Sequence, residues 1–392
     1  MANLVLGWEL GGNSGHVHRI IALSKALVAA GHRVHLAVQR PSAFYNIVGV
    51  SSVWQAPIWP GLLKFGGVAP LGPPASYGDL LVNLGLRSAS EVVGIVRAWD
   101  AILTALRPDA VIGDFAPGLM LASAGRMPRF TIGTGFTVPP VHLDLFPTLP
   151  RPDWTTTGHA PLVEAEVIST LIAAAFDRMG RPISGPVPPL LGGDHALPAV
   201  FAPLDPYADH RESAPLSPFL ADGLPDLIPS APAGLFVYLP ASDLRAEQID
   251  LICRVAQTCP VTGYLPGAPN EVLHCLSTAG VRLSPKPLSW HEIASTCTAA
   301  LCNGGMGTVS AALLANRNLI VAPGGIEQRH TAQALRSHDL GLSLLHTAPE
   351  AQLDAVLDQI SQSPDIARTM SLRSGFSDPC PVIEQAVTAT CH

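Results

Sequence analysis

Two apolar segments, each followed by glycines and by the start of a helix, constrain the fold most strongly. Residues 299–302 are an apolar run that leads into a glycine turn at 304–307, and a helical pattern begins at Thr308. A second apolar run, 319–322, ends at Pro323-Gly324-Gly325. Buried strands that alternate with helices predict a parallel sheet. Bare backbone N–H groups at a glycine turn before a helix favour an anion, so this stretch predicts an anion-binding site.

The same alternation of apolar runs and helical patterns extends over most of the chain. A length of 392 residues is too great for one ordinary core, so two domains are expected. The proline, serine and aspartate content of 208–232 is typical of a linker. We predict α/β domains with doubly wound parallel sheets at 1–215 and 216–375, a ligand in the cleft between them, and a tail, 376–392, that returns to the first domain.

The composition narrows the class of partner. Charged residues make up 14% of the chain and the net charge is −7, which is not the basic pattern of a nucleic-acid-binding protein. No apolar run is long enough to cross a membrane, and the first residues lack the cationic region of a signal peptide. The seven cysteines form no CxxC pair, which is typical of reduced thiols. We therefore expect a cytoplasmic protein, and a homodimer stays open.

Polar residues of the first half follow the ends of predicted strands. His16 comes after the run 4–6, Asp114 after 110–113, and Thr134 and Phe136 after 129–133. In an open parallel sheet these strand ends line the ligand crevice. Residues 41–88, which include Trp59 and Phe65, lack a clear period and are rich in aromatics. They form either a binding loop or surface loops packed by their own aromatics, and the sequence favours neither.

Four motifs, in the same order along the chain, resemble family 1 glycosyltransferases of the GT-B fold, the type that includes macrolide and natural-product glycosyltransferases. The residues that carry the donor motif are Asn303-Gly304-Gly305-x-Gly307-Thr308, then Pro323 and Glu327-Gln328. Those that look like the first βα unit are Gly12-x-x-Gly15-His16 and Gly31-His32-x-Val34. Asp109, Val111 and Asp114 look like the strand with the catalytic aspartate, and Pro285-Lys286 resembles the nucleotide-base loop. The resemblance implies the GT-B fold, two Rossmann-like domains that face a cleft.

The resemblance also implies roles for individual residues. His16 would be the base and Asp114 its orienting carboxylate, because a neutral imidazole can take a hydroxyl proton at ambient pH. The donor-binding residues would be Ser242, Lys286, Asn303, Gly304, Gly305, Met306, Gly307, Thr308, Glu327 and Gln328. The acceptor-binding residues would be Trp59, Phe65, Thr134 and Phe136. The implied reaction is inverting transfer from a UDP- or dTDP-sugar to a hydroxyl of a small apolar acceptor, and the nucleotide sugar is a co-substrate, so no cofactor is expected.

The sequence departs from the family pattern at three places. Asn303 stands where the family has a phosphate-binding histidine, and Ala311 where it has a ribose-binding glutamate. The segment 316–318 replaces a Gly-x-Pro. Asn303 can donate a neutral hydrogen bond but cannot become cationic, and the Ala311 side chain cannot bind a hydroxyl. A different donor, a weaker one or lost catalysis would each follow from these changes.

Each residue also has an ordinary structural explanation. His16 and Asp114 could be a helix-terminal and a capping residue, the glycines could serve tight packing, and Ser242 could be a turn residue. We favour the catalytic pair because the family order supports it. No Asp-x-Asp motif and no third ligand beside His16 and His18 occur, so no metal site is expected. A sugar-nucleotide epimerase and a non-catalytic relative that binds a partner enzyme stay open.

Overall fold

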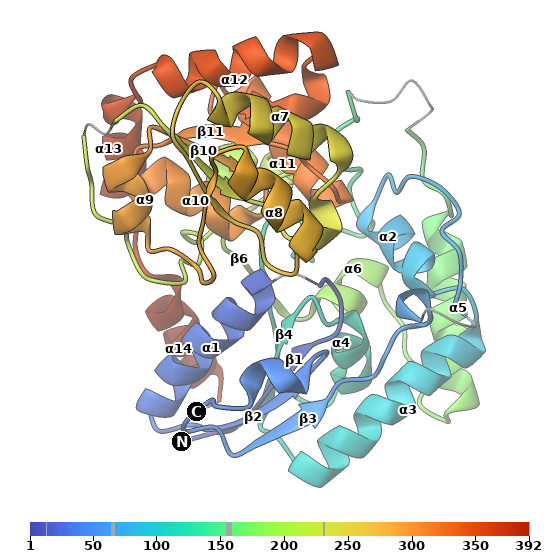
Figure 1. Cartoon of the computed structure of the whole chain (residues 1–392). Coiled ribbons are helices and arrows are strands. Elements are labelled where there is room, and N and C mark those ends of the chain that lie inside the picture. Colours follow the sequence, from blue (N-terminus) through green and yellow to red (C-terminus); the bar gives the residue numbers. More distant parts are fainter. Residues whose placement is uncertain (13, 64–66, 154–158, 230–231, 392) are drawn as a thin grey trace. The chain divides into compact units, whose positions relative to one another are not determined.

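The computed structural model describes the chain as two compact units, each built around one sheet (Figure 1). It describes residues 1–12, 14–63, 67–153, 159–229 and 232–391. The first unit holds 1–151, 157–216 and 378–392, and the second holds 152–156 and 217–377. Each sheet has six strands, all paired in parallel, with helices on both faces. The predicted α/β class with two doubly wound sheets is confirmed.

The first unit has the strand order β3-β2-β1-β4-β5-β6. Helices α1 and α14 lie side by side on one face of this sheet, whereas α3, α4, α5 and α6 pack together on the other (Figure 1). The elements are β1 (Asn3–Trp8), α1 (Ser14–Ala29), β2 (Arg33–Val38), β3 (Ser52–Gln55), α2 (Tyr77–Leu84), α3 (Ala89–Leu106), β4 (Ala110–Asp114), α4 (Pro117–Ser123), β5 (Arg129–Gly133), α5 (Ala165–Arg178), α6 (Val187–Gly192), β6 (His195–Pro198) and α14 (Pro379–Thr390).

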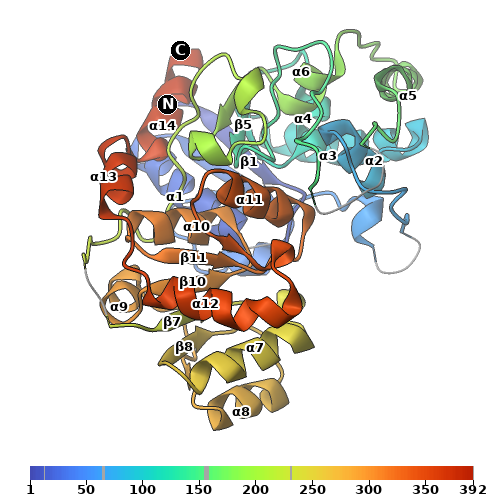
Figure 2. The same cartoon turned by 90° about the horizontal axis from the view of Figure 1, so that it is seen from above.

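The second unit has the order β12-β11-β10-β7-β8-β9. Figure 2 shows α7, α8 and α12 on one side of its strands and α10, α11 and α13 on the other. The elements are β7 (Leu235–Tyr238), α7 (Ala246–Ala256), β8 (Val261–Tyr264), α8 (Asn270–Thr278), β9 (Arg282–Leu283), α9 (Trp290–Thr296), β10 (Ala299–Cys302), α10 (Met306–Leu314), β11 (Asn318–Val321), α11 (Ile326–Ser337), β12 (Leu342–Ser343), α12 (Gln352–Ser361) and α13 (Ile366–Ser374).

Strand order reverses once in each sheet, between β1 and β4 in the first unit and between β7 and β10 in the second. On the two sides of such a switch point the following helices go to opposite faces of the sheet. The carboxyl ends of the two central strands are therefore left uncovered, and this is where open α/β sheets bind ligands. The residues that follow β1, β4, β7 and β10 are thus the first candidates for function.

The sequence does not predict the two outer strands of the first sheet. β3 and β6 form the two edges of the first sheet, and β9 and β12, which have two residues each, form the edges of the second. An edge strand is covered less completely than a central one, so it needs no continuous apolar run. β6 also ends in Pro198, which only an edge strand accommodates readily.

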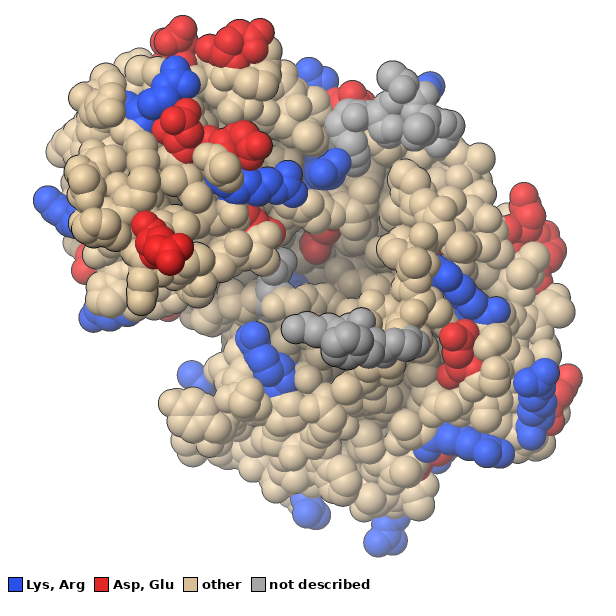
Figure 3. Space-filling view, turned by 45° about the vertical axis from the view of Figure 1, so that its right-hand side comes forward, with Lys and Arg blue, Asp and Glu red and all other residues tan. Residues whose placement is uncertain are grey.

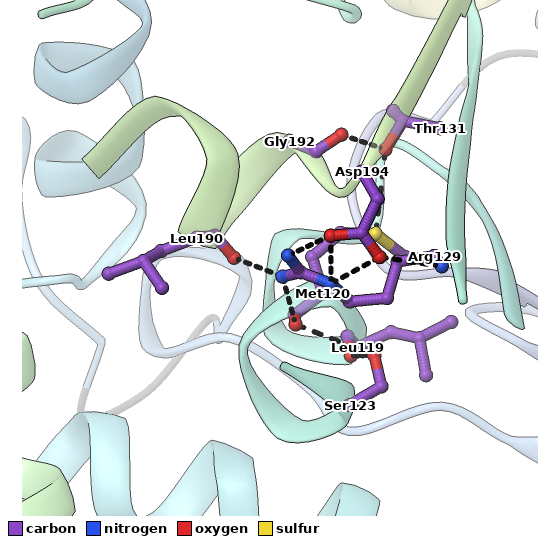
Figure 4. Close-up of polar contacts among 8 residues, drawn as sticks. All are labelled: Leu119, Met120, Ser123, Arg129, Thr131, Leu190, Gly192 and Asp194. Carbon is purple, nitrogen blue, oxygen red and sulfur yellow. Dashed lines mark hydrogen bonds and ion pairs between the residues drawn. The ribbon is translucent and has the colours of Figure 1, made fainter. Parts of the chain in front are cut away.

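A buried arginine ties three elements of the first unit together (Figure 4). Arg129, at the start of β5, donates to the carboxylate of Asp194, which precedes β6. Its Nη1 also donates to the carbonyl oxygen of Met120 in α4 at 3.1 Å and to that of Leu190 in α6 at 3.3 Å. One guanidinium group therefore satisfies two helix carbonyls as well as a carboxylate.

Replacing Arg129 by methionine is expected to lower the free energy of unfolding by about 2–3 kcal/mol, because buried carbonyl groups and a carboxylate lose their donor. Urea unfolding measures this loss, provided that the slope of the unfolding free energy against urea concentration, m, is the same in both proteins. Arg126→Met is the matched control, since the Arg126 side chain is 34% exposed in its pair with Asp100 and should lose about 1 kcal/mol or less. Equal losses in the two variants would contradict the structural role of the Arg129 network.

The surface carries charges of both signs. On the face in Figure 3 the basic and acidic side chains lie in small groups separated by uncharged surface. In the described parts of the chain, no helix has the length and apolar character needed to cross a membrane. The cytoplasmic location and the homodimer stay predictions from the sequence.

Candidate functional site

The strand order of the first unit brings His16 and Asp114 together. β1 and β4 are neighbours, and Trp8, the last residue of β1, pairs with Asp114, the last residue of β4. His16 lies in the first turn of α1, which follows β1, and its Nδ1 is 3.0 Å from Oδ1 of Asp114. Both side chains are buried. Two residues far apart in the sequence thus meet at the switch point of the sheet.

Arg19 is a third member of this cluster, and the sequence analysis missed it. Its Nε donates to Oδ2 of Asp114 at 2.9 Å, and its Nη2 lies 3.4 Å from Nδ1 of His16. Burial alone would raise the pKa of Asp114, but the charge of Arg19 and the contact with His16 outweigh burial, so this pKa is lowered. The spacing of three residues from His16 puts both on one helix face, which was the available signal.

Aromatic rings and a glycine enclose the imidazole. Trp8 stacks on His16 with ring centroids 5.3 Å apart, and Phe115 stacks at 6.5 Å. Gly11 has a φ of +80°, and a Cβ added to it would lie 2.4 Å from Nε2 of His16. Because Nδ1 faces Asp114, Nε2 is the nitrogen available to a substrate proton, and the backbone at Gly11 passes close to it.

A buried carboxylate anchors the loop behind this cluster. Glu9 accepts from Nε1 of Trp59 at 2.5 Å and from the backbone N–H groups of Gly118 and Leu119, which begin α4. Burial raises the pKa of Glu9 to about 7 against these hydrogen bonds. The segment that follows Asp114 is held in place by this carboxylate.

The described residues that were predicted to bind the acceptor are all buried. Trp59 is fully buried, and its hydrogen bond to Glu9 gives it a packing role in the core rather than a surface for an acceptor. Thr134 and Phe136 follow β5 as predicted and are also buried. Phe65 lies outside the described residues. Neither of the two described aromatic residues in this set, Trp59 and Phe136, is therefore exposed.

The second unit carries a polar pair at its own switch point. Asn303 follows β10, and Asp243 ends the short 3-10 helix Ala241–Asp243 that follows β7. Nδ2 of Asn303 donates to Oδ2 of Asp243 at 2.6 Å, and its Oδ1 accepts from the N–H of Gly305 at 3.0 Å. The amide that we predicted to face phosphate is thus bound to a carboxylate. Asp243 was not predicted, because nothing in its local sequence marks it.

The glycine turn retains other donors for an anion. Gly304 has a φ of +89°, which requires glycine, and α10 begins at Met306. The N–H groups at the start of a helix have no partner within the helix, and here they belong to Met306, Gly307 and Thr308. Gly307 is exposed and Thr308 is partly exposed. An anion could therefore bind here by backbone N–H groups and one hydroxyl.

The remaining predicted donor residues have varied surroundings. Gln328 is buried, and its Oε1 accepts from the N–H groups of Gly324 and Gly325 at 2.8 Å, so it shapes the turn after β11. Glu327 is partly exposed beside it. Ser242 is exposed next to Asp243, whereas Lys286 lies on the exposed loop between β9 and α9.

Comparison with solved structures identifies the architecture. The calicheamicin glycosyltransferase CalG4 superposes with a TM-score of 0.69 over 99% of this chain and 98% of its own, at 19% identity. The spinosyn rhamnosyltransferase SpnG complexed with thymidine diphosphate gives 0.64 over 97% and 99%, at 16% identity. SnogD from Streptomyces nogalater, also a glycosyltransferase, gives 0.60 over 100% of both chains, at 17% identity. The chain has the GT-B fold.

The predicted GT-B fold is therefore confirmed over the whole chain. No family model matches the sequence, and no curated protein matches it either. The structure places His16 beside Asp114, as the sequence analysis expected, and their catalytic role stays a prediction. The hydrogen bond between Asn303 and Asp243 was not expected.

Proposed function

We propose that the protein is a glycosyltransferase that moves a sugar from a nucleoside diphosphate to a hydroxyl group. The observation that carries this proposal is the buried pair of His16 and Asp114 at the switch point of the first sheet. A carboxylate beside Nδ1 orients an imidazole and stabilises its protonated form. The fold supports the same reading, because the similar structures reported above are all named as glycosyltransferases.

The proposed reaction is a single displacement. Nε2 of His16 takes the proton of the acceptor hydroxyl, and Asp114 stabilises the imidazolium that forms. The acceptor oxygen bonds to the anomeric carbon while the bond from that carbon to the diphosphate oxygen breaks. The N–H groups of Met306, Gly307 and Thr308 receive the negative charge of the leaving diphosphate. One displacement inverts the anomeric configuration, and none of these steps requires a metal ion.

A thymidine-diphosphate sugar is the first donor to test, and a UDP-sugar the second. Two of the similar structures are described as complexes with this nucleotide, namely VinC and SpnG. For the acceptor we propose a small apolar molecule, since the SpnG structure with spinosyn aglycone is another of the similar ones. Thr134 and Phe136 are the positions proposed to lie near it.

The test is a panel of dTDP- and UDP-sugars with apolar aglycones, with and without EDTA, in which release of the nucleoside diphosphate and the anomeric configuration of the product are measured. Transfer with inversion that EDTA leaves unchanged is expected. Failure of every donor to bind or to turn over would overturn the proposal. That result would favour a non-catalytic relative. The hydrogen bond between Asn303 and Asp243 is consistent with such a relative, because it occupies an amide that was predicted to contact phosphate.

Gly11→Ala is expected to lower kcat by about 10- to 100-fold, since the added methyl would lie 2.4 Å from Nε2 of His16 and displace the base. Gly12→Ala is the matched control, because nothing lies within 4 Å of a Cβ at that position. Steady-state kinetics of both variants, with thermal unfolding to check the fold, gives the comparison. A wild-type rate in the Gly11 variant would show that the loop does not constrain His16.

A further inference from the structure

The residue that follows Asp114 has a strained backbone. Phe115 has a φ of +49°, in the left-handed region that a residue with a large side chain rarely adopts. Such a conformation persists only where the surrounding structure holds it. It turns the chain between the end of β4 at Asp114 and the start of α4 at Pro117. The Phe115 ring is buried and stacks on His16, with ring centroids 6.5 Å apart.

Two neighbouring residues of the loop after β1 hold this turn on both sides. The N–H of Leu10 donates to the carbonyl oxygen of Phe115 at 3.1 Å. On the other side, Glu9 accepts from the N–H of Gly118 at 3.0 Å and from that of Leu119 at 2.6 Å. These two N–H groups have no partner within α4, because they belong to its first turn. Residues 9 and 10 therefore fasten the loop after β4 to the loop after β1.

The Glu9 carboxylate is built closely into this place. Glu9 is fully buried, and its Oε2 also accepts from Nε1 of Trp59, so three N–H groups meet two carboxylate oxygens. A Cβ added to Gly118 would lie 2.9 Å from Oε2 of Glu9 and 2.5 Å from the Ile95 side chain. Glycine at position 118 thus allows the carboxylate to come this close. An amide in place of the carboxylate would turn its own N–H groups toward other N–H groups.

We propose that Glu9 is a positioning residue that holds Phe115 in its left-handed conformation. The turn at Phe115 in its turn sets Asp114 beside His16. Residues 8–11, to which Glu9 belongs, also contact the imidazole, so one carboxylate fixes two of the loops that surround it. The role in catalysis rests on the proposed function. The hold on the loop does not, because it can be measured without any substrate.

Amide hydrogen exchange of the full chain, followed by NMR, tests the hold directly. In the wild type, the N–H groups of Gly118 and Leu119 should be protected, because each donates to a buried carboxylate. Wherever the amide nitrogen of Glu9→Gln lies, it faces at least one of these N–H groups, which should then exchange about 10-fold faster or more. Unchanged protection in this variant would overturn the proposal. So would unprotected amides in the wild type, a result that stands even if Glu9→Gln fails to fold.

Asp194→Asn is the matched control for a general loss of stability. The Asp194 carboxylate also accepts from a backbone N–H, that of Arg129, but at the amino end of β5, whereas the site lies at the carboxyl ends of the strands. This variant should lower the melting temperature and leave exchange at positions 118 and 119 unchanged. Equal acceleration in the two variants would overturn the role of Glu9.

A second background tests the link to the strained backbone. Glycine adopts a φ of this sign without strain, so the loop of Phe115→Gly should depend less on Glu9. The fall in melting temperature that Glu9→Gln causes should therefore be smaller in Phe115→Gly than in the wild type. Equal falls in the two backgrounds would show that Glu9 does not hold the conformation of Phe115.

Kinetics then separates this inference from the proposed function. With a transferable donor, Glu9→Gln should lower kcat by about 10- to 100-fold and leave KM for the donor unchanged, because the reacting groups lose their alignment. Asp194→Asn should keep a kcat near that of the wild type. Faster exchange in Glu9→Gln without transfer by any variant, wild type included, supports the hold and overturns the glycosyltransferase proposal. A wild-type kcat in Glu9→Gln overturns the positioning role and leaves the proposed function standing.

Discussion

Replacing His16 by alanine is expected to lower kcat by about 100- to 10,000-fold while binding of the nucleoside diphosphate is unchanged. The loss follows from removal of the general base, whose contribution is of this order. The binding is retained because the proposed diphosphate contacts are N–H groups of the second unit, at Met306, Gly307 and Thr308. Single-turnover transfer and isothermal titration with dTDP or UDP measure the two quantities separately.

His18→Ala is the matched control for this experiment. His18 is on the same helix and is exposed, so its loss should leave both transfer and binding near the wild-type values. If His16→Ala transferred sugar at the rate of the control, His16 would not be the base. If it lost nucleotide binding as well, the donor site would include α1, contrary to the proposed division of roles.

Replacing Asp114 by asparagine is expected to reduce kcat by about 100- to 10,000-fold. Asparagine has nearly the same shape, but it carries no charge to stabilise the imidazolium that forms at His16. It also leaves the buried Arg19 without its carboxylate, so the free energy of unfolding should fall by about 3 kcal/mol. Rapid-quench transfer assays and urea unfolding measure the two effects.

Asp109→Asn is the control, because Asp109 is an exposed carboxylate just before the same strand, where it accepts from the N–H of Asn3. It should change neither transfer nor, by more than about 1 kcal/mol, stability. If Asp114→Asn transferred sugar at a rate within about tenfold of this control, Asp114 would not be a member of the catalytic pair.

The contribution of Asp114 to stability should depend on pH. Its pKa is lowered in the folded protein, so the pair contributes stability that is present at neutral pH, above the unfolded pKa of about 4. That stability is lost as the pH falls through the folded pKa. The difference in stability between wild type and Asp114→Asn should therefore shrink in strongly acidic buffer.

The central strands could be predicted well from the sequence, because each leaves its own continuous apolar run. The apolar run 299–302 is β10, and 129–133 is β5, both without a shift. Central strands of a parallel sheet are buried on both faces, which leaves a continuous apolar run in the sequence. The edge strands β3 and β6 have no such run, and the helices α2 and α6 are short, so none of the four was predicted.

The candidate site was predicted only where a residue follows a predicted strand. His16 and Asp114 were found in this way, and the structure brings them together. Trp59 was taken for an acceptor contact, yet its indole donates to the buried Glu9. Its burial depends on a side chain from another segment, and the pattern of 41–88 contains no information on it.

The sequence alone thus determined the alternation of strands and helices, the parallel sheets and the glycine turn at 304–307, since each follows from local periodicity and backbone freedom. Only the tertiary structure decided that Arg19 shares the carboxylate of Asp114 with His16, and that Asp243 binds the amide of Asn303. These contacts join residues from different strand ends. Their partners are set by the order of strands in each sheet, a property of the folded chain that no single segment encodes.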